Sequence, residues 1–221
     1  MRHQVMIGLI YEGTTDVRFL TSVVKRTFAN IARECWGDVE ILDPVDLKKE
    51  KDKFVEEVLT AAMTGLQVYG VTVLCVHTDA DSETDENAYK HKIEPAKRTL
   101  KESTEILCAN LVPIVPVHMQ EAWLLADLAL LKRQIGTDRN DAELGLEKKP
   151  EAISDPKRAI SEAIRIAREG LTKRRRDDLK IGDLYQPIGQ SISLASLQKL
   201  ASYKKFEEHV RDAFRELKLL V

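Results

Sequence analysis

Short apolar runs alternate with helical periodicity along the first part of the chain. Residues 5–11 (VMIGLIY) are almost continuously apolar, which is typical of a strand covered on both faces. Beyond Glu12 and Gly13 the apolar residues are spaced three and four apart, which is the spacing of a helix. Thr14 or Thr15 is available to cap this helix. The pattern therefore predicts a strand, a tight turn and a helix.

The same alternation continues along the chain. Further strands are predicted at residues 39–42, 71–76 and 111–117, and helices at residues 48–66 and 86–105. Prolines at positions 113 and 116 suit an edge strand, because proline donates no hydrogen bond to a neighbouring strand. Alternating strands and helices pack as a parallel sheet with helices on both faces. The predicted fold class is α/β, with a mainly parallel four-stranded sheet flanked by helices.

The last third of the chain has a different pattern. Residues 135–156 are rich in charged residues, glycine and proline, as in an exposed connection. Apolar or amphipathic helices are predicted at residues 119–131, 157–169 and 194–220, the last broken near 201–205. We therefore expect a core, residues 1–131, and a helical C-terminal extension, residues 132–221, that packs on it.

The composition narrows the class of protein. The chain has 221 residues, of which 43% are hydrophobic and 32% charged, and this balance predicts a globular protein rather than a disordered or membrane protein. Acidic and basic residues nearly cancel, 36 against 34, giving a formal net charge of −2. Such a charge provides no general attraction to a polyanion, so any nucleic-acid surface has to be local.

Cysteine usage and hydropathy predict the compartment. The three cysteines are far apart in sequence and too few for a disulfide framework, so we expect buried thiols in a reducing environment. No window approaches the roughly 18 uncharged apolar residues that a membrane span requires. The N-terminus also lacks the pattern of a signal peptide. We expect no membrane association and a cytoplasmic location.

Acidic residues follow two of the predicted strands. Glu12 stands at the carboxyl end of the first strand, and Asp79 and Asp81 follow the third. Ligands of open α/β sheets bind beyond these ends, so the three carboxylates converge if the two strands are neighbours. Their repulsion then requires a cation or a proton, and hard carboxylate oxygens select Mg²⁺ or Mn²⁺. The alternative is that Asp79 and Asp81 serve only as turn residues and a helix cap.

Two short motifs carry a resemblance to a known family. The segment YEGTTD at residues 11–16 resembles the first motif of the Toprim family, a strand that ends in Glu-Gly. The segment DADS at residues 79–82 resembles the second, an Asp-x-Asp after an apolar strand. Residues 121–127 and the DPK at 155–157 are also similar to small Toprim-like proteins found near defence and mobile-element genes. Toprim is the phosphodiester-handling core of topoisomerases, bacterial primases and nucleases of the overcoming-lysogenization-defect type.

The resemblance implies a role for each acidic residue. Asp79 and Asp81 would hold one Mg²⁺ or Mn²⁺ ion, and Glu12 would be a further ligand or the general acid/base. Asp16, together with Glu121, would complete a second metal position. These five residues are the expected metal ligands, and Glu12, Asp79 and Asp81 the expected catalytic residues. The implied function is a Mg²⁺-dependent nuclease that hydrolyses nucleic acid, DNA in the first place, in phage defence or mobile-element biology.

Other interpretations remain open. A non-catalytic Toprim-like partner or regulatory subunit could bind metal or nucleic acid, with a partner ATPase, and the near-neutral charge favours this reading. Phosphoryl transfer on a small nucleotide is a third candidate. His77 and His118 flank the acidic residues and could assist them. The basic run KRRR at residues 173–176 could bind backbone phosphates or form a solvated loop.

Overall fold

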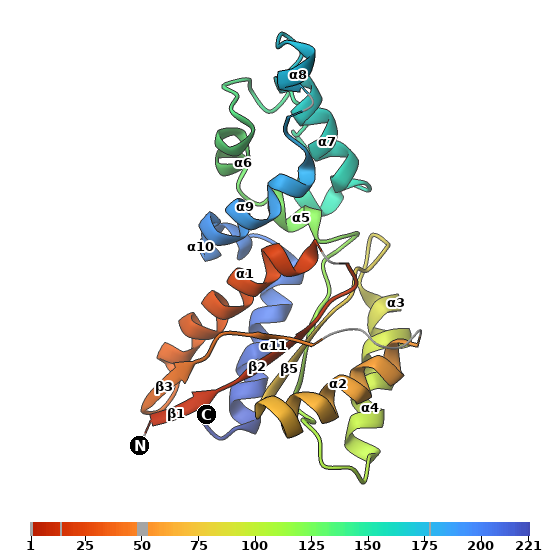
Figure 1. Ribbon diagram of the computed structural model, residues 1–221, viewed down its shortest axis with the longest axis vertical. Coiled ribbons are helices and arrows are strands. Elements are labelled where there is room, and N and C mark those ends of the chain that lie inside the picture. The colour runs from red at the N-terminus through yellow and green to blue at the C-terminus, as the bar shows by residue number, and fades with distance from the viewer. Residues whose placement is uncertain (1, 14, 48–52, 177) are drawn as a thin grey trace.

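A parallel four-stranded sheet, in the order β4-β2-β5-β6, lies at the centre of the protein (Figure 1). Its strands are β4 (Val45–Asp46), β2 (Ile7–Ile10), β5 (Val73–His77) and β6 (Leu111–Ile114). This computed structural model describes residues 2–13, 15–47, 53–176 and 178–221. The predicted cap at Thr14 and the predicted helix start at 48–52 therefore lie outside the described residues.

The order of the strands confirms two predictions, and the predicted site depends on the first of them. β2 and β5 are parallel neighbours, with Ile10 opposite Val76, so their carboxyl ends meet at one edge of the sheet. β6, which contains Pro113, lies at the end of the order, as its prolines suggest. The α/β fold with a parallel sheet flanked by helices is confirmed.

One predicted strand belongs to a different sheet. β3 (Asp38–Ile41), expected in the main sheet, pairs instead with β1 (Arg2–Val5) as a separate two-stranded parallel sheet. Its place at the edge of the main sheet is taken by β4, which pairs with β2. β4 has only two residues, too few for a periodic pattern to be recognised in the sequence.

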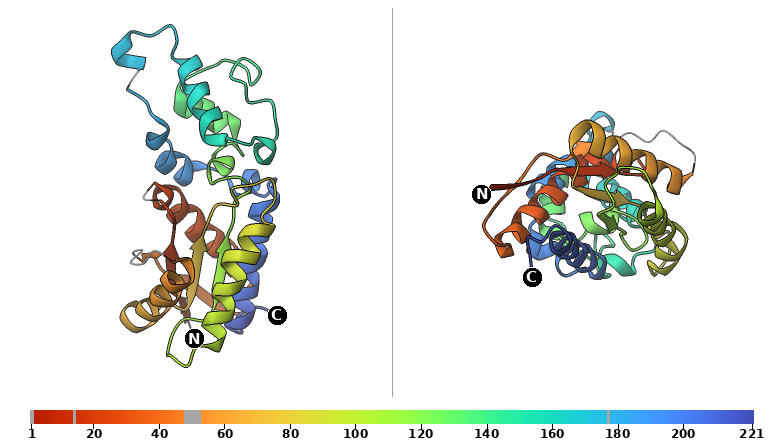
Figure 2. Two further views of the ribbon diagram at one scale, coloured as in Figure 1. Left: turned by 90° about the vertical axis from the view of Figure 1, so that its right-hand side faces the viewer. Right: turned by 90° about the horizontal axis from the view of Figure 1, so that it is seen from below.

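Helices cover both faces of the sheet. α1 (Asp16–Ile31) and α11 (Ala201–Glu216) pack on one face, and α2 (Phe54–Tyr69) and α4 (Glu94–Glu102) on the other (Figure 1; Figure 2). Alternate residues of β5 enter the two cores, because successive side chains of a strand point to opposite faces. α4 is preceded by a short helix, α3 (Glu86–Ala88), and a π-helical turn, η2 (Tyr89–Ile93).

The C-terminal region is helical, as predicted, and forms a lobe beyond the carboxyl edge of the sheet (Figure 1; Figure 2). Its helices are α5 (Glu121–Leu124), α6 (Leu128–Ile135), η3 (Pro150–Ala152), α7 (Pro156–Ala167), α8 (Lys173–Arg176), η4 (Ile181–Asp183), α9 (Tyr185–Ser191) and α10 (Leu194–Leu197). α11 then returns along the sheet, where Asn110 donates a hydrogen bond to the Ala213 carbonyl. The lobe therefore begins and ends on the core.

Two helix predictions in this region were wrong in detail. The single helix expected at 119–131 is interrupted, because the Asp127 side chain accepts a hydrogen bond from the Leu130 amide and caps a new helix, α6. The break expected near 201–205 lies earlier, between α10 and α11. No helix among the described residues is both long and apolar enough to cross a membrane.

α9 is fixed tightly to α1. The Arg26 guanidinium donates hydrogen bonds to the carbonyls of Gly189 and Ile192, at 2.7 and 2.6 Å. Gly189 approaches the backbone of α1 so closely that a Cβ there would lie 2.8 Å from the Phe19 carbonyl oxygen. Only glycine fits this contact. The lobe is thus held on the helix that begins at the predicted site.

Candidate functional site

Glu12 lies at the carboxyl edge of the sheet, directly beyond β2, and is held by two donors. Its Oε1 accepts hydrogen bonds from Thr78 Oγ1 at 2.6 Å and from Lys92 Nζ at 3.0 Å. Lys92 Nζ also donates to Thr78 Oγ1 at 2.6 Å, which closes a three-residue network. Burial raises the pKa of Glu12, but the hydrogen bonds from Thr78 and Lys92 outweigh it and lower the pKa overall.

His77, the last residue of β5, lies between two of the predicted carboxylates. Its side chain is 0% exposed, with Nδ1 3.5 Å from Asp16 Oδ2 and Nε2 3.3 Å from Asp79 Oδ1. Both nitrogens are at ion-pair distance, outside well-aligned hydrogen-bond geometry. Burial lowers the pKa of His77, but Asp79, followed by Asp16 and Glu12, raises it by a larger amount. The arrangement favours a positively charged His77 between two acidic side chains.

Asp16 and Asp79 are also fixed by the backbone. The Gly13 amide donates to Asp16 Oδ2 at 2.7 Å, and the Gln120 amide donates to Asp79 Oδ1 at 2.8 Å. Burial raises the pKa of Asp16 and nearby Asp79 and Glu12 add to it, against the lowering effects of His77 and the Gly13 amide. These carboxylates therefore repel one another across the edge of the sheet.

Asp81 is exposed and has an unusual backbone conformation. Its φ is 53°, and that of His118 is 58°, both in the left-handed region that Asp and His tolerate better than most residues. The Asp81 amide donates to the His118 carbonyl at 2.9 Å, while the His118 amide donates to the Ser82 carbonyl at 3.0 Å. The loops after β5 and β6 are tied together in this way. Burial and the neighbouring Asp79 raise the pKa of Asp81.

Glu121 has a different environment. It is buried at the first residue of α5 and accepts a hydrogen bond from the Tyr185 hydroxyl of α9. Lys157 Nζ lies 3.9 Å from its Oε1. The pKa of Tyr185 is raised by burial and by Glu121, and further by Asp16 and Asp79. Glu121 is thus linked to the acidic residues through Tyr185 and makes no described contact with their carboxylates.

The structure brings four of the five predicted ligands into one electrostatic cluster, which we call the acidic edge: Glu12, Asp16, Asp79 and Asp81. Across the described ranges, no group of three or more His, Cys, Asp or Glu side chains is arranged so that it could hold a metal ion. Instead, the Lys92 ammonium and the His77 ring lie against these carboxylates.

Sequence reasoning did not assign roles to Thr78, Lys92 or Tyr185. Thr78 directly follows His77 at the carboxyl end of β5, so its position after an apolar strand was an available signal. Lys92 comes from the π-helical turn η2, and such turns are frequent at functional sites but have no recognisable sequence pattern. Tyr185 comes from α9, a short helix that was not predicted.

The fold and the acidic edge define an α/β protein whose sheet ends in a cluster of carboxylates, with Lys92 and His77 beside them. A family model described as a domain of unknown function, DUF4276, matches residues 11–211, and the chain belongs to this family. No curated protein and no solved structure matches the chain. The matched residues include both the acidic edge and the helical lobe. The description of the family names no activity, so the Toprim resemblance stays a prediction.

Proposed function

We propose that the protein is a Toprim-like nuclease that hydrolyses nucleic-acid phosphodiester bonds with Mg²⁺ or Mn²⁺ at the acidic edge. The observation that carries this proposal is the convergence of Glu12, Asp16 and Asp79 around His77, with Asp81 beside them. Glu12, Asp79 and Asp81 follow strand ends and Asp16 begins α1, all at the carboxyl edge of the sheet, which is the usual place for a ligand. Phage defence or mobile-element biology is the setting that the resemblance implies.

The donor chemistry of the acidic edge suits a divalent cation, but the carboxylates would have to draw closer to hold one, because no three of the described His, Cys, Asp or Glu side chains are grouped as a metal site. Four carboxylates stand against the Lys92 ammonium and the His77 ring, so negative charge is in excess at the acidic edge. All four donors are hard oxygen ligands, which Mg²⁺ and Mn²⁺ prefer. Asp79, Asp81 and Glu12 would hold the ion, with Asp16 adjacent. When bound, the ion would supply a water nucleophile and neutralise charge that develops on the phosphate.

The chain's own residues would then orient the substrate. Lys92 Nζ, which contacts Glu12 and Thr78 in the described state, is a ready partner for a phosphate oxygen. Asp79 is fixed by the Gln120 amide, which holds its carboxylate at the edge. Positioning of this kind is what in-line phosphoryl displacement requires of a protein.

Cleavage assays with matched variants test the proposal. Purified protein is incubated with plasmid and single-stranded DNA in Mg²⁺ or Mn²⁺, alongside Glu12→Gln, Asp79→Asn and the control Asp43→Asn. Asp43 is an exposed carboxylate paired with Lys25, away from the acidic edge. We expect cleavage by the wild type and the control and its loss in both site variants. Cleavage that both site variants retain would contradict the assignment.

A second candidate is a non-catalytic partner subunit that binds metal or nucleic acid. The observation in its favour is that Lys92 and His77 already compensate the carboxylates, with no formed three-ligand site among the described residues. Metal titration separates the two candidates. Tight Mn²⁺ binding without cleavage of any nucleic acid, and cleavage only after addition of a partner ATPase, would favour the partner subunit.

A further inference from the structure

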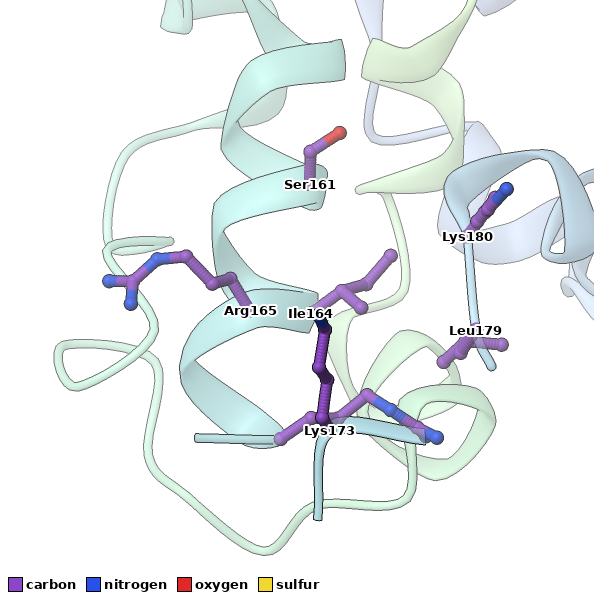
Figure 3. A pocket seen from close by; sticks show the side chains of 7 residues that line it. Ser161, Ile164, Arg165, Lys173, Leu179 and Lys180 are labelled. Atoms are coloured by element: carbon purple, nitrogen blue, oxygen red, sulfur yellow. The ribbon is translucent and has the colours of Figure 1, made fainter. Parts of the chain in front are cut away.

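A pocket of about 750 Å³ (Figure 3) is lined by residues of α7 and α8, which lie at the outer end of the helical lobe (Figure 1). It opens between α7 and the segment that follows α8. The residues that line it, which we call the basic pocket, are Ser161, Ile164, Arg165, Arg168, Lys173, Leu179 and Lys180. Four of them are cationic and none is acidic, so the pocket is suited to an anion.

The positive charges of the basic pocket are only partly compensated. Arg165 extends to the other side of α7 (Figure 3) and is paired with Glu162. Arg168 Nε donates a hydrogen bond to the Arg175 carbonyl at 3.0 Å. Because a carbonyl carries no net charge, the positive charge of Arg168 is not neutralised by this contact. Within the described ranges, no acidic side chain forms an ion pair with Lys173 or Lys180, and both lysines are exposed. Arg168, Lys173 and Lys180 therefore have no acidic partner among the described residues.

The pocket also has an apolar side. Ile164 is buried on α7, and Leu179 lies on the facing segment beside Lys180 (Figure 3). An inorganic phosphate would leave this apolar surface in contact with water. A nucleotide strand presents anionic phosphates together with the apolar faces of its bases and sugars, so it matches both halves of the lining.

α7 runs from the neighbourhood of Glu121 to the basic pocket. Near its beginning Lys157 Nζ lies 3.9 Å from Glu121 Oε1, and at its end Arg168 lines the pocket. From position 157 to position 168 the chain advances about 16 Å, at about 1.5 Å per helical residue. A strand stacked as in a duplex has a phosphate about every 3.4 Å along its axis, so this length corresponds to about five stacked nucleotides. A strand of several nucleotides can follow α7 over this length, whereas a single nucleotide cannot.

We propose that the basic pocket holds the phosphodiester backbone of a nucleic-acid strand whose reacting bond lies at the acidic edge. The identity of the reacting bond rests on the proposed function. Arg168, Lys173 and Lys180 contact phosphates and so fix the strand without reading its sequence. The near-neutral net charge of the chain is then no obstacle, because the attraction is local to the lobe.

Binding without cleavage tests this assignment separately from the nuclease proposal. Fluorescence anisotropy is measured with a labelled single-stranded oligonucleotide in EDTA, which removes divalent ions. The test variant is Lys173→Glu/Lys180→Glu. The control is Arg98→Glu/Lys101→Glu, which reverses two exposed charges on α4 and changes the net charge by the same amount. Thermal unfolding of each variant confirms that it is folded.

We expect the pocket variant to bind at least about tenfold more weakly than the wild type, and its plot of log affinity against log salt to be shallower by about 1.4 for two lost phosphate contacts. The control should bind like the wild type. Equal affinity of the wild type and the pocket variant would overturn the assignment, as would equal losses in the two variants. Binding of polyglutamate as tight as that of the oligonucleotide would overturn the choice of ligand.

The two proposals can fail independently. If the pocket variant loses binding in EDTA while the wild type cleaves nothing in Mn²⁺, the basic pocket stands and the nuclease proposal fails. If the wild type cleaves DNA while the pocket variant binds as well as the wild type, the nuclease proposal stands and the basic pocket fails.

Discussion

The acidic edge and the basic pocket carry opposite charges and hold them in different ways. At the acidic edge, Glu12, Asp16 and Asp79 each accept a hydrogen bond from a specific donor, and His77 and Lys92 compensate their charge. In the basic pocket, lysines 173 and 180 are exposed and form no ion pair with the described acidic residues. One set of charges is positioned by the fold, and the other is solvated.

This difference indicates a division of labour. Chemistry on a phosphodiester requires groups that are preorganised before the substrate arrives. Attraction of a polyanion requires only a local excess of positive charge, and flexible lysines supply it at no cost in desolvation. If this division is correct, substitutions in the acidic edge and in the basic pocket should affect cleavage and binding separately.

The largest expected effect comes from Asp79→Asn. Asparagine keeps the oxygen that accepts the Gln120 amide but removes the negative charge. We expect cleavage in Mn²⁺ to fall by at least about 100-fold, as is usual when a group that organises a metal site is lost. Oligonucleotide binding in EDTA should be unchanged or tighter, because the variant repels phosphates less. Parallel assays of turnover and anisotropy measure both quantities, and a matching loss of binding would break the division of labour.

The next largest effect should come from Gly189→Ala, which tests whether the lobe depends on its close contact with α1. The added Cβ would meet the Phe19 backbone at 2.8 Å, so we expect a loss of stability of about 1–3 kcal/mol, typical of overpacking. Thermal unfolding measures it. The control is Gly182→Ala, where a Cβ has nothing within 4 Å and should change little. Equal unfolding temperatures of the two variants would show that α9 is not held as described.

The smallest effect should come from Lys92→Gln, which removes a compensating cation from the acidic edge. Lys92 is half-buried in its network with Glu12 and Thr78, and we expect a loss of about 1 kcal/mol in EDTA, or about 2–4 °C in unfolding temperature. Mn²⁺ should stabilise this variant more than the wild type, because the carboxylates are left less compensated. Lys90→Gln, an exposed neighbour in the same turn, is the control. A smaller Mn²⁺ effect in Lys92→Gln than in the wild type would contradict competition between Lys92 and metal.

The sequence predicted the central part of the site because that part depends on local patterns. Glu12 and Asp79 each follow a short apolar run that is typical of a buried strand, and parallel strands bring their carboxyl ends to one edge. The neighbouring position of β2 and β5 was an assumption that the structure confirms.

The residues that the sequence did not reveal are those placed by tertiary packing. Lys92 stands in a run with Lys90 and His91, and nothing local distinguishes the lysine that the π-helical turn directs toward Glu12. Tyr185 meets Glu121 across a separation of 64 residues, through a contact that depends on how α9 packs against α1. The basic run at residues 173–176 was recognised in the sequence. The pocket was not, because its other walls, α7 and the segment with Lys180, are brought to this run by tertiary packing.

The central claim is that the carboxylates of the acidic edge form a divalent-metal site, and a structure of crystals soaked in Mn²⁺ tests it most directly. Anomalous scattering locates the ion without reference to any assumed function. We predict a peak at direct coordination distance from Asp79 and Asp81, with Glu12 turned from Lys92 toward the ion. Absence of a peak at this edge in saturating Mn²⁺, with Glu12 still bound to Lys92 and Thr78, would contradict the account.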